Sequence, residues 1–181
     1  MIERKYSTFW LRFAAGLLDG LIMMPVGWIC GALMHSPWLP IRMVSGVVNE
    51  TFPLVYSIWM HGKYGQTLGK MACGVIVLDI SEQPLTMKQA FLRDIFGVAF
   101  LLIGWIIEFH DSIYGPALSQ SEPISVTLMV VGYSALGLFG VEVLTMLTNR
   151  KRRALHDFIA GSVVIQKPSV VRAPATAATS T

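Results

Sequence analysis

One apolar stretch near the start of the chain constrains the fold more than any other feature: Phe9 to Met34, FWLRFAAGLLDGLIMMPVGWICGALM. At ~1.5 Å of rise per residue, its roughly 26 residues can cross the ~30 Å hydrocarbon core of a bilayer. The stretch nevertheless contains Arg12 and Asp19. A charge at the centre of a membrane helix costs roughly 2.5–3.5 kcal/mol even on mild insertion scales, so both charges must be paired, hydrated or used. Both lie on nearly one face of a helix, and we predict that this face points toward other helices.

The composition also indicates a membrane protein. Hydrophobic residues make up 54% of the 181 residues and charged residues 14%, with a mean hydropathy of +0.58, whereas soluble domains usually carry about 25% charged residues. The first apolar stretch is longer than the ~7–15-residue core of a signal peptide, so we expect it to remain as the first span. We place Cys30 in a helix and Cys73 in a cytoplasmic loop, and expect no disulfide and no metal site. No catalytic constellation is visible, so we expect neither an enzyme nor a cofactor.

Four apolar stretches predict an all-α integral membrane protein, a bundle of four transmembrane helices. The spans lie at about 9–34, 39–61, 88–110 and 124–147. The second span is the weakest, because Arg42, Asn49 and Glu50 interrupt it. Its tail, FPLVYSIWM, is too long and too aromatic for a loop. Thr86 precedes the third span as a candidate N-cap.

The basic residues predict the orientation of these spans. Arg4 and Lys5, the three lysines of the segment 62–88 and the cluster Arg150 to Arg153 fall on one side of the membrane. The loops on the other side contain neither Lys nor Arg. The positive-inside rule then places both termini in the cytoplasm and the basic cluster against anionic headgroups. We expect residues 1–167 to form the transmembrane domain and residues 168–181, rich in Pro, Ala and Thr, to form a disordered tail.

Two short segments on the cytoplasmic side have the β-branched density of strands. They are GVIVLD at 74–79 and GSVVIQ at 161–166. Pairing would satisfy the backbone groups of both, and we predict a small cytoplasmic β-ribbon that joins the middle loop to the C-terminal segment. Because an isolated ribbon is only marginally stable, it should pack against the helices.

The charged residues inside the spans form two predicted layers. Counting along the helices brings Asp19, Asn49 and Glu50 to one level near the midplane. The others lie one or two turns closer to the cytoplasm: Arg12, Arg93, Asp94 and Glu142.

Two interpretations of these charges remain open. In the structural one, Arg12 and Arg93 pair with Asp94 and Glu142 and fix the helix bundle. In the functional one, Asp19 and Glu50, with Asn49 and Glu142 as further candidates, bind a proton or a small cation along a transport path. Burial favours a neutral carboxyl group and a nearby arginine favours the carboxylate, so the two effects together permit exchange.

Three segments, taken together, resemble the RDD family of membrane proteins, which is named for one arginine and two aspartates. They are RFAAGLLDGLIM with Arg12 and Asp19, GQTLGKMACGVIVLD at 65–79 followed by Arg93, and RALHDFIAGSVVI at 153–165. Arg12 and Asp19 match the family's first arginine and aspartate, and Asp157 is assigned as the other aspartate. From the residues alone, Asp157 would form a salt bridge to the basic cluster or cap a turn. As a family residue outside the membrane, it would instead suggest a gate near the inner mouth.

The resemblance implies transport, with sodium/proton exchange attributed to some members, and a bacterial inner-membrane location. Arg42 and Glu50 depart from a minimal member of the family. The first hypothesis is therefore a transporter or cation/proton exchanger for a small ion or solute. The alternative is a membrane scaffold or accessory subunit whose buried charges fix helix assembly. Expected partners are the lipid bilayer, a small ion or solute and further copies of the chain, since four helices enclose little volume; no nucleic-acid partner is expected.

Overall fold

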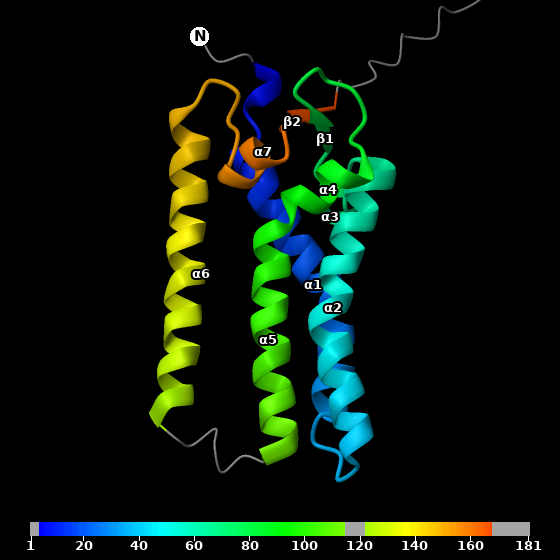
Figure 1. Cartoon of the computed structure of the whole chain (residues 1–181). Helices are drawn as coiled ribbons and strands as arrows, with labels where there is room; N and C mark the ends of the chain where they lie inside the picture. The colour runs from blue at the N-terminus through cyan, green and yellow to red at the C-terminus, as the bar shows by residue number, and fades with distance from the viewer. Residues whose placement is uncertain (1–3, 115–121, 168–181) are drawn as a thin grey trace, which may run out of the picture.

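The computed structural model describes residues 4–114 and 122–167, and four long helices lie side by side in it (Figure 1). They are α1 (Phe9–Leu33), α2 (Leu39–Tyr64), α5 (Ile95–Tyr114) and α6 (Glu122–Thr148). Each of the four predicted stretches is therefore helical. Short elements gather at one end of these helices: η1 (Arg4–Tyr6), α3 (Leu68–Ala72), α4 (Met87–Arg93), α7 (Leu155–Ile159), β1 (Val75–Asp79) and β2 (Ser162–Gln166). The tail predicted at 168–181 lies outside the described residues.

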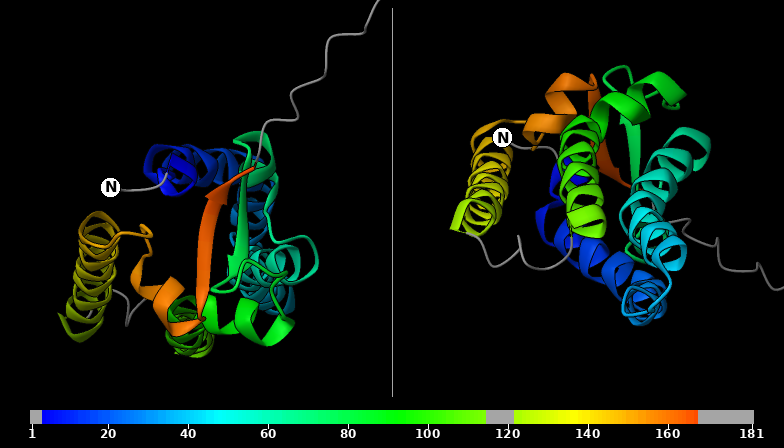
Figure 2. Two further views of the ribbon diagram at one scale, coloured as in Figure 1. Left: turned by 90° about the horizontal axis from the view of Figure 1, so that it is seen from above. Right: turned by 60° about the horizontal axis from the view of Figure 1, so that its bottom comes forward.

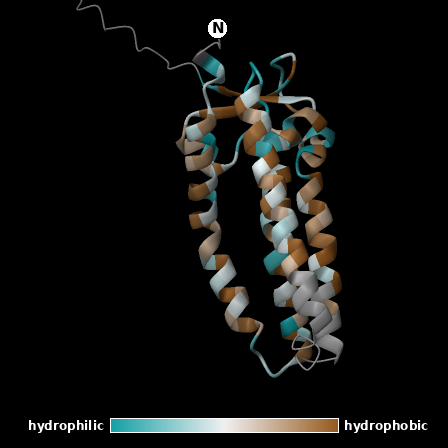
Figure 3. Cartoon of the chain, turned by 90° about the vertical axis from the view of Figure 1, so that its left-hand side faces the viewer, coloured by the Kyte–Doolittle hydropathy of each residue, from teal (hydrophilic) through white to brown (hydrophobic). Residues whose placement is uncertain are grey.

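Two of the described helices are long and apolar enough to cross a membrane, namely α1 and the segment Met129–Thr148 of α6. The pair Met87–Arg93 and Ile95–Ile106 makes a third if it forms one broken span. The long helices carry mostly apolar colours, and hydrophilic residues gather at the end that holds the sheet (Figure 3). Large apolar side chains such as Trp28 (72%) and Leu136 (67%) are exposed to the surroundings, as expected for helices whose solvent is lipid. The chain is thus a membrane protein with a polar end.

The predicted ribbon is confirmed as a two-stranded antiparallel sheet, in which β1 and β2 run side by side (Figure 2). Its register pairs Val75 with Gln166 and Asp79 with Ser162. One face of the sheet packs with partly buried side chains of the long helices, Leu11 of α1 and Ile58 of α2. Tyr6 of η1 covers Val163 and Ile165. The helices and η1 cover the apolar residues of the ribbon and so stabilise it. An isolated two-stranded ribbon would lack this cover and would be only marginally stable.

The third predicted stretch is not one continuous helix. Thr86 caps α4 as expected, in a capping box with Gln89. However, α4 ends at Arg93, and α5 departs from it at an angle of 62°. Asp94 stands at the break. The bend allows α4 to lie across the polar end of the molecule, while α5 continues along the other long helices (Figure 1). Arg93, the last residue of α4, is buried.

Candidate functional site

Asp157 is the centre of a buried ionic cluster. Its side chain is fully buried, and Arg12 Nη2 lies 2.7 Å from its Oδ2. Arg93 donates to its Oδ1, as does the Ser162 hydroxyl at 3.1 Å. The backbone N–H of Ala154 donates to Oδ2 at 3.0 Å, so Asp157 also caps the start of α7. One carboxylate therefore joins α1, α4, α7 and β2, which lie far apart in the sequence.

The charges around Asp157 decide its ionisation. Burial alone would raise the pKa of the Asp157 carboxyl, but Arg93 and Arg12 outweigh burial and hold that pKa well below its usual range. Asp157 is therefore a carboxylate at every physiological pH. Both arginine side chains are almost as deeply buried, with 8% of Arg12 and 4% of Arg93 exposed. Of the two alternatives drawn for Asp157 from the residues, the turn cap is present. The predicted salt bridge to the basic cluster is wrong, because the carboxylate pairs with Arg12 and Arg93, and Arg153 contacts only the backbone oxygen of Asp157.

The arginine partners differ from those predicted. Arg12 and Arg93 pair with Asp157, not with Asp94 and Glu142. The physical reason is that the C-terminal segment folds back onto the helices, so that Asp157 of α7 reaches Arg12 of α1 and Arg93 of α4. Counting residues along the spans cannot predict this contact. Asp94 instead accepts a hydrogen bond from the Ser57 hydroxyl at 3.0 Å, and Glu142 lies 2.5 Å from Nδ1 of His156.

The C-terminal side of the cluster contains one further correction and one new contact. Arg153 was predicted to lie against lipid headgroups with its basic neighbours, but it is buried and donates to the backbone oxygens of Ser162 and Asp157, both at 2.8 Å. Burial and the charge of Arg93 lower the pKa of the His156 imidazole, so this side chain is neutral near pH 7. His156 therefore links Glu142 of α6 to the cluster as a neutral group.

Asp19 anchors α3 to the first helix. It accepts hydrogen bonds from the Tyr56 hydroxyl at 3.1 Å, the Thr67 hydroxyl at 2.5 Å and the backbone N–H of Gly69 at 2.8 Å. The close approach requires a glycine, because a Cβ on Gly69 would lie 2.2 Å from the carbonyl oxygen of Ala15. The polar face predicted for α1 therefore points toward other elements of the protein, as expected.

The predicted common level of Asp19, Asn49 and Glu50 is wrong. The nearest neighbour of Gly27 on α1 is the side chain of Asn49, which places Asn49 about 12 Å further along α1 than Asp19, at ~1.5 Å per residue. Glu50 lies against Gly104 of α5, and Asp19 meets α2 at Tyr56. The segment after α2 folds back toward α1 through α3, so Asp19 belongs to the polar end and Glu50 lies deeper among the helices.

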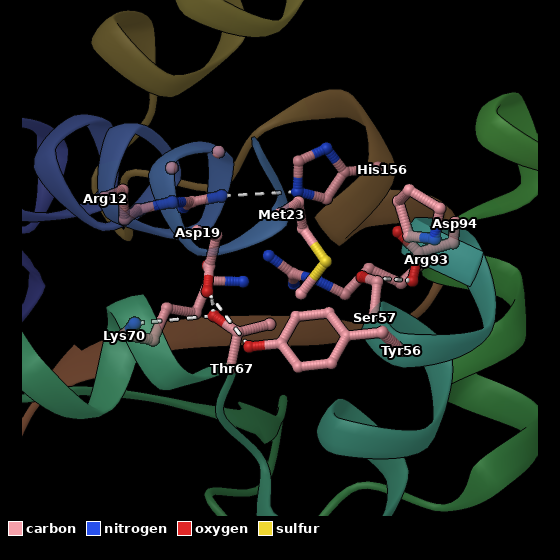
Figure 4. A pocket seen from close by; sticks show the side chains of 13 residues that line it. Arg12, Asp19, Met23, Tyr56, Ser57, Thr67, Lys70, Arg93, Asp94 and His156 are labelled. Atoms are coloured by element: carbon pink, nitrogen blue, oxygen red, sulfur yellow. Dashed lines mark hydrogen bonds between the residues drawn. The ribbon is translucent and has the colours of Figure 1, made fainter. Parts of the chain in front are cut away.

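A cavity of about 440 Å³ separates Asp19 from Asp94. Figure 4 shows Arg12, Asp19 and Lys70 on one side and Ser57 and Asp94 on the other. The full lining is Arg12, Gly16, Asp19, Gly20, Met23, Pro53, Tyr56, Ser57, Thr67, Lys70, Arg93, Asp94 and His156. A second cavity of about 460 Å³ shares Pro53, Ser57 and Asp94 with the first and extends to Glu50. Asp94 and Ser57 therefore stand where two cavities meet.

Several of these residues were not singled out from the sequence. Lys70 was counted only among the positive charges of a cytoplasmic loop, yet its Nζ lies 2.5 Å from Nε2 of His61. The back-folding of α3 that brings them together has no periodic signal in the sequence. Among the described residues, no group of three or more His, Cys, Asp or Glu side chains could hold a metal ion. The site is an array of carboxylates, bases and hydroxyls around an open space.

The fold and this site define a membrane protein with an ionic cluster and a charged cavity at the polar end of its helices. The RDD family model matches residues 6–161, and the chain belongs to the RDD family. The resemblance carried by Arg12, Asp19 and the LHD segment is thus confirmed.

A protein of Bacillus subtilis (strain 168), named as the uncharacterized membrane protein YteJ, is 30% identical over 109 residues. The match covers 54% of this chain and 64% of that relative, so the chain spans just under two thirds of the relative's length. No solved structure matches the chain.

Proposed function

We propose that this chain transports a small ion across a bacterial inner membrane, by exchanging a monovalent cation for a proton. It crosses the membrane four times, through α1, α2, the broken pair α4 and α5, and α6. Both termini and the sheet lie in the cytoplasm. The distribution of Lys and Arg supports this orientation, because the loop between α1 and α2 contains neither.

The observation that carries the proposal is the pair of joined cavities. The first cavity is lined by Asp19, at the polar end, and by Asp94. The second is lined by Asp94 and by Glu50, deeper among the helices, so the two place three carboxylates along largely apolar walls. Charged groups are expensive among membrane helices, and they are retained chiefly where they line a path or pair with one another. Arg12 and Arg93 have the paired arrangement, and Asp19, Asp94 and Glu50 line the path.

The carboxylates of the cavity accept hydrogen bonds from neutral donors, an arrangement that is compatible with cation binding. Asp19 accepts hydrogen bonds from two hydroxyls and a backbone N–H, and Asp94 accepts one from a hydroxyl. Neutral donors leave the negative charge of a carboxylate available, whereas the charge of Asp157 is neutralised by two arginines. Carboxylate and hydroxyl oxygens are also the ligands that hard cations prefer.

Cation-driven proton flux in proteoliposomes tests this proposal. Purified wild-type protein should move protons against added sodium, potassium or lithium, and Asp19→Asn and Glu50→Gln should abolish that flux at equal incorporation and thermal stability. Asp79→Asn is the matched control, since Asp79 lies at the end of β1 and bonds only locally to Ser81 and Gln83 among its described contacts. Well-folded wild-type protein without flux under any cation would overturn the proposal.

The second candidate function is that of a membrane scaffold or accessory subunit. The observation in its favour is the Asp157 cluster, in which one carboxylate joins α1, α4, α7 and β2. In this case Asp19→Asn and Glu50→Gln should reduce abundance or assembly in proportion to any loss of function. Retention of full abundance with loss of flux would exclude this candidate.

A homo-oligomer accompanies either function in our proposal. Four helices enclose little volume for a path, so a path would need further copies of the chain. Native mass spectrometry in detergent should therefore show a dimer or a larger assembly. A monomer that transports would overturn this part of the proposal.

A further inference from the structure

A lysine and a histidine share a hydrogen bond at the wall of the cavity. Nζ of Lys70, on α3, lies 2.5 Å from Nε2 of His61, on α2. The other ring nitrogen of His61, Nδ1, lies 2.8 Å from the backbone carbonyl oxygen of Ser57. A carbonyl oxygen can only accept, so Nδ1 carries a hydrogen. In a neutral imidazole, Nε2 then offers a lone pair, and Lys70 is the donor to it.

This geometry limits the pair to one positive charge. If His61 were protonated, Nε2 would carry a hydrogen and would face the Lys70 ammonium without a lone pair to accept its bond. Loss of one proton from Lys70 leaves an amine and an imidazole, both neutral and still within bonding distance. Lys70 and His61 therefore have two states that differ by a single proton.

The surroundings make the loss of that proton accessible. Burial, then the charges of Arg93 and Arg12, lower the pKa of Lys70 well below its ordinary value, while Asp94 and Asp157 act in the opposite direction. Charged and titratable groups face the pair from every packed element: Arg12 and Asp19 on α1, Arg93 and Asp94 at α4, and His156 and Asp157 at α7. Two arginines are unusual neighbours for a lysine that serves only as a fixed charge.

The pair also connects to both cavities. Lys70 lines the first cavity with Asp19 and Asp94. On the other side, the Ser57 hydroxyl lies 3.2 Å from Nδ1 of His61 and donates to Asp94 at 3.0 Å. Asp94 borders both cavities. A change in the charge of Lys70 therefore changes the electrostatic potential at Asp19 and Asp94, the carboxylates that would hold a cation.

We propose that Lys70 and His61 form the proton-binding site of the exchanger, an inference that rests on the proposed function. When a monovalent cation enters between Asp19 and Asp94, Lys70 releases one proton from Nζ to water in the cavity. The N–H bond breaks, its electron pair stays on the neutral amine, and His61 keeps its tautomer. One positive charge enters and one leaves, so the charge of the cavity is unchanged.

Proton release on cation binding tests this site directly. Wild-type protein in detergent, weakly buffered near neutral pH, should release about one proton per bound cation when sodium, potassium or lithium chloride is added, as linkage requires. Lys70→Arg keeps the positive charge but does not deprotonate in this range. It should release no proton and lose exchange in proteoliposomes. Lys63→Arg is the matched control, because Lys63 is an exposed lysine that lies over Trp59, outside the cavity, and it should behave as wild type.

A second variant covers the case in which Lys70→Arg does not fold. His61→Gln retains an acceptor for Lys70 but removes the imidazole, so proton release should persist with a shifted pH midpoint. An unchanged midpoint, or a Lys70→Arg variant that exchanges as wild type does, would overturn the proton site while leaving cation/proton exchange standing. Absence of exchange in the wild type would overturn both.

Discussion

The Asp157 cluster and the cavity beside it contain the same kinds of side chain, but they differ in how completely the charges are satisfied. Asp157 is fully buried and holds two arginines, a hydroxyl and a backbone N–H. Asp94 retains 23% exposure of its side chain and lines two cavities. We therefore expect the cluster to maintain the fold, and in our proposal the charges of the cavity serve to bind a cation. Variants of the two regions should therefore fail in different ways.

Neutralising Asp157 should have the largest effect on stability. Asp157→Asn leaves Arg12 and Arg93 buried without their counter-charge, and loss of one partner from a buried ion pair typically costs about 3–5 kcal/mol. We expect little folded protein in the membrane and a strongly lowered Tm in detergent. Normal abundance and Tm would show that the cluster is not what holds the four segments together, and would favour the gate-like role suggested by the family resemblance.

Obstructing the close contact between α3 and α1 should have the next largest effect on stability. A Cβ at Gly69 would meet the Ala15 carbonyl oxygen at 2.2 Å and Cγ of Asp19 at 2.9 Å. Gly69→Ala should therefore push α3 away from α1 and cost about 1–3 kcal/mol, as overpacking does. Gly31→Ala is the control, because no atom lies within 4 Å of its added Cβ. Equal melting temperatures for both variants would contradict this packing of α3.

The lowered pKa of Lys70 predicts a pH dependence of stability. Between the pKa of Lys70 in the folded protein and the ordinary lysine pKa of 10.5, the unfolded chain binds the proton that the folded chain has released. The free energy of unfolding therefore rises with pH in this window, by at most about 1.4 kcal/mol per pH unit. Lys70→Met should flatten the rise in Tm on the alkaline side of pH 7, and Lys63→Met should not. A wild-type Tm that does not rise with pH would contradict the shift.

The smallest effect is expected at an ion pair outside both regions. Lys5 and Glu82 meet at 2.7 Å, but 40% and 37% of their side chains are exposed. Water and salt screen such pairs, so Glu82→Gln should leave the Tm within experimental error of wild type. A large decrease would mean that the 2.7 Å contact of Glu82 with the Tyr6 hydroxyl, at the cover of the sheet, matters more than its exposure suggests.

The sequence alone determined the membrane class, the positions of the long helices and the two strands. These follow from local patterns: runs of apolar residues for the helices, and dense β-branched residues for β1 and β2. The sequence also identified Arg12 and Asp19 as candidate site residues, because they are charges within an apolar stretch. The family motif added Asp157. These features can be predicted from the sequence because each depends only on residues that are close together in the chain.

Only the tertiary structure decided which of these charges meet. Arg12 and Asp157 are separated by 145 positions but lie 2.7 Å apart, and Lys70 reaches His61 because α3 folds back toward α1. The break at Asp94 depends on the packing of α4 across the polar end. An unpaired buried charge is costly, so the packing of the helices decides which buried charges form pairs, as Arg12 and Arg93 do with Asp157. That pairing depends on distances between segments far apart in the sequence, which no local pattern contains.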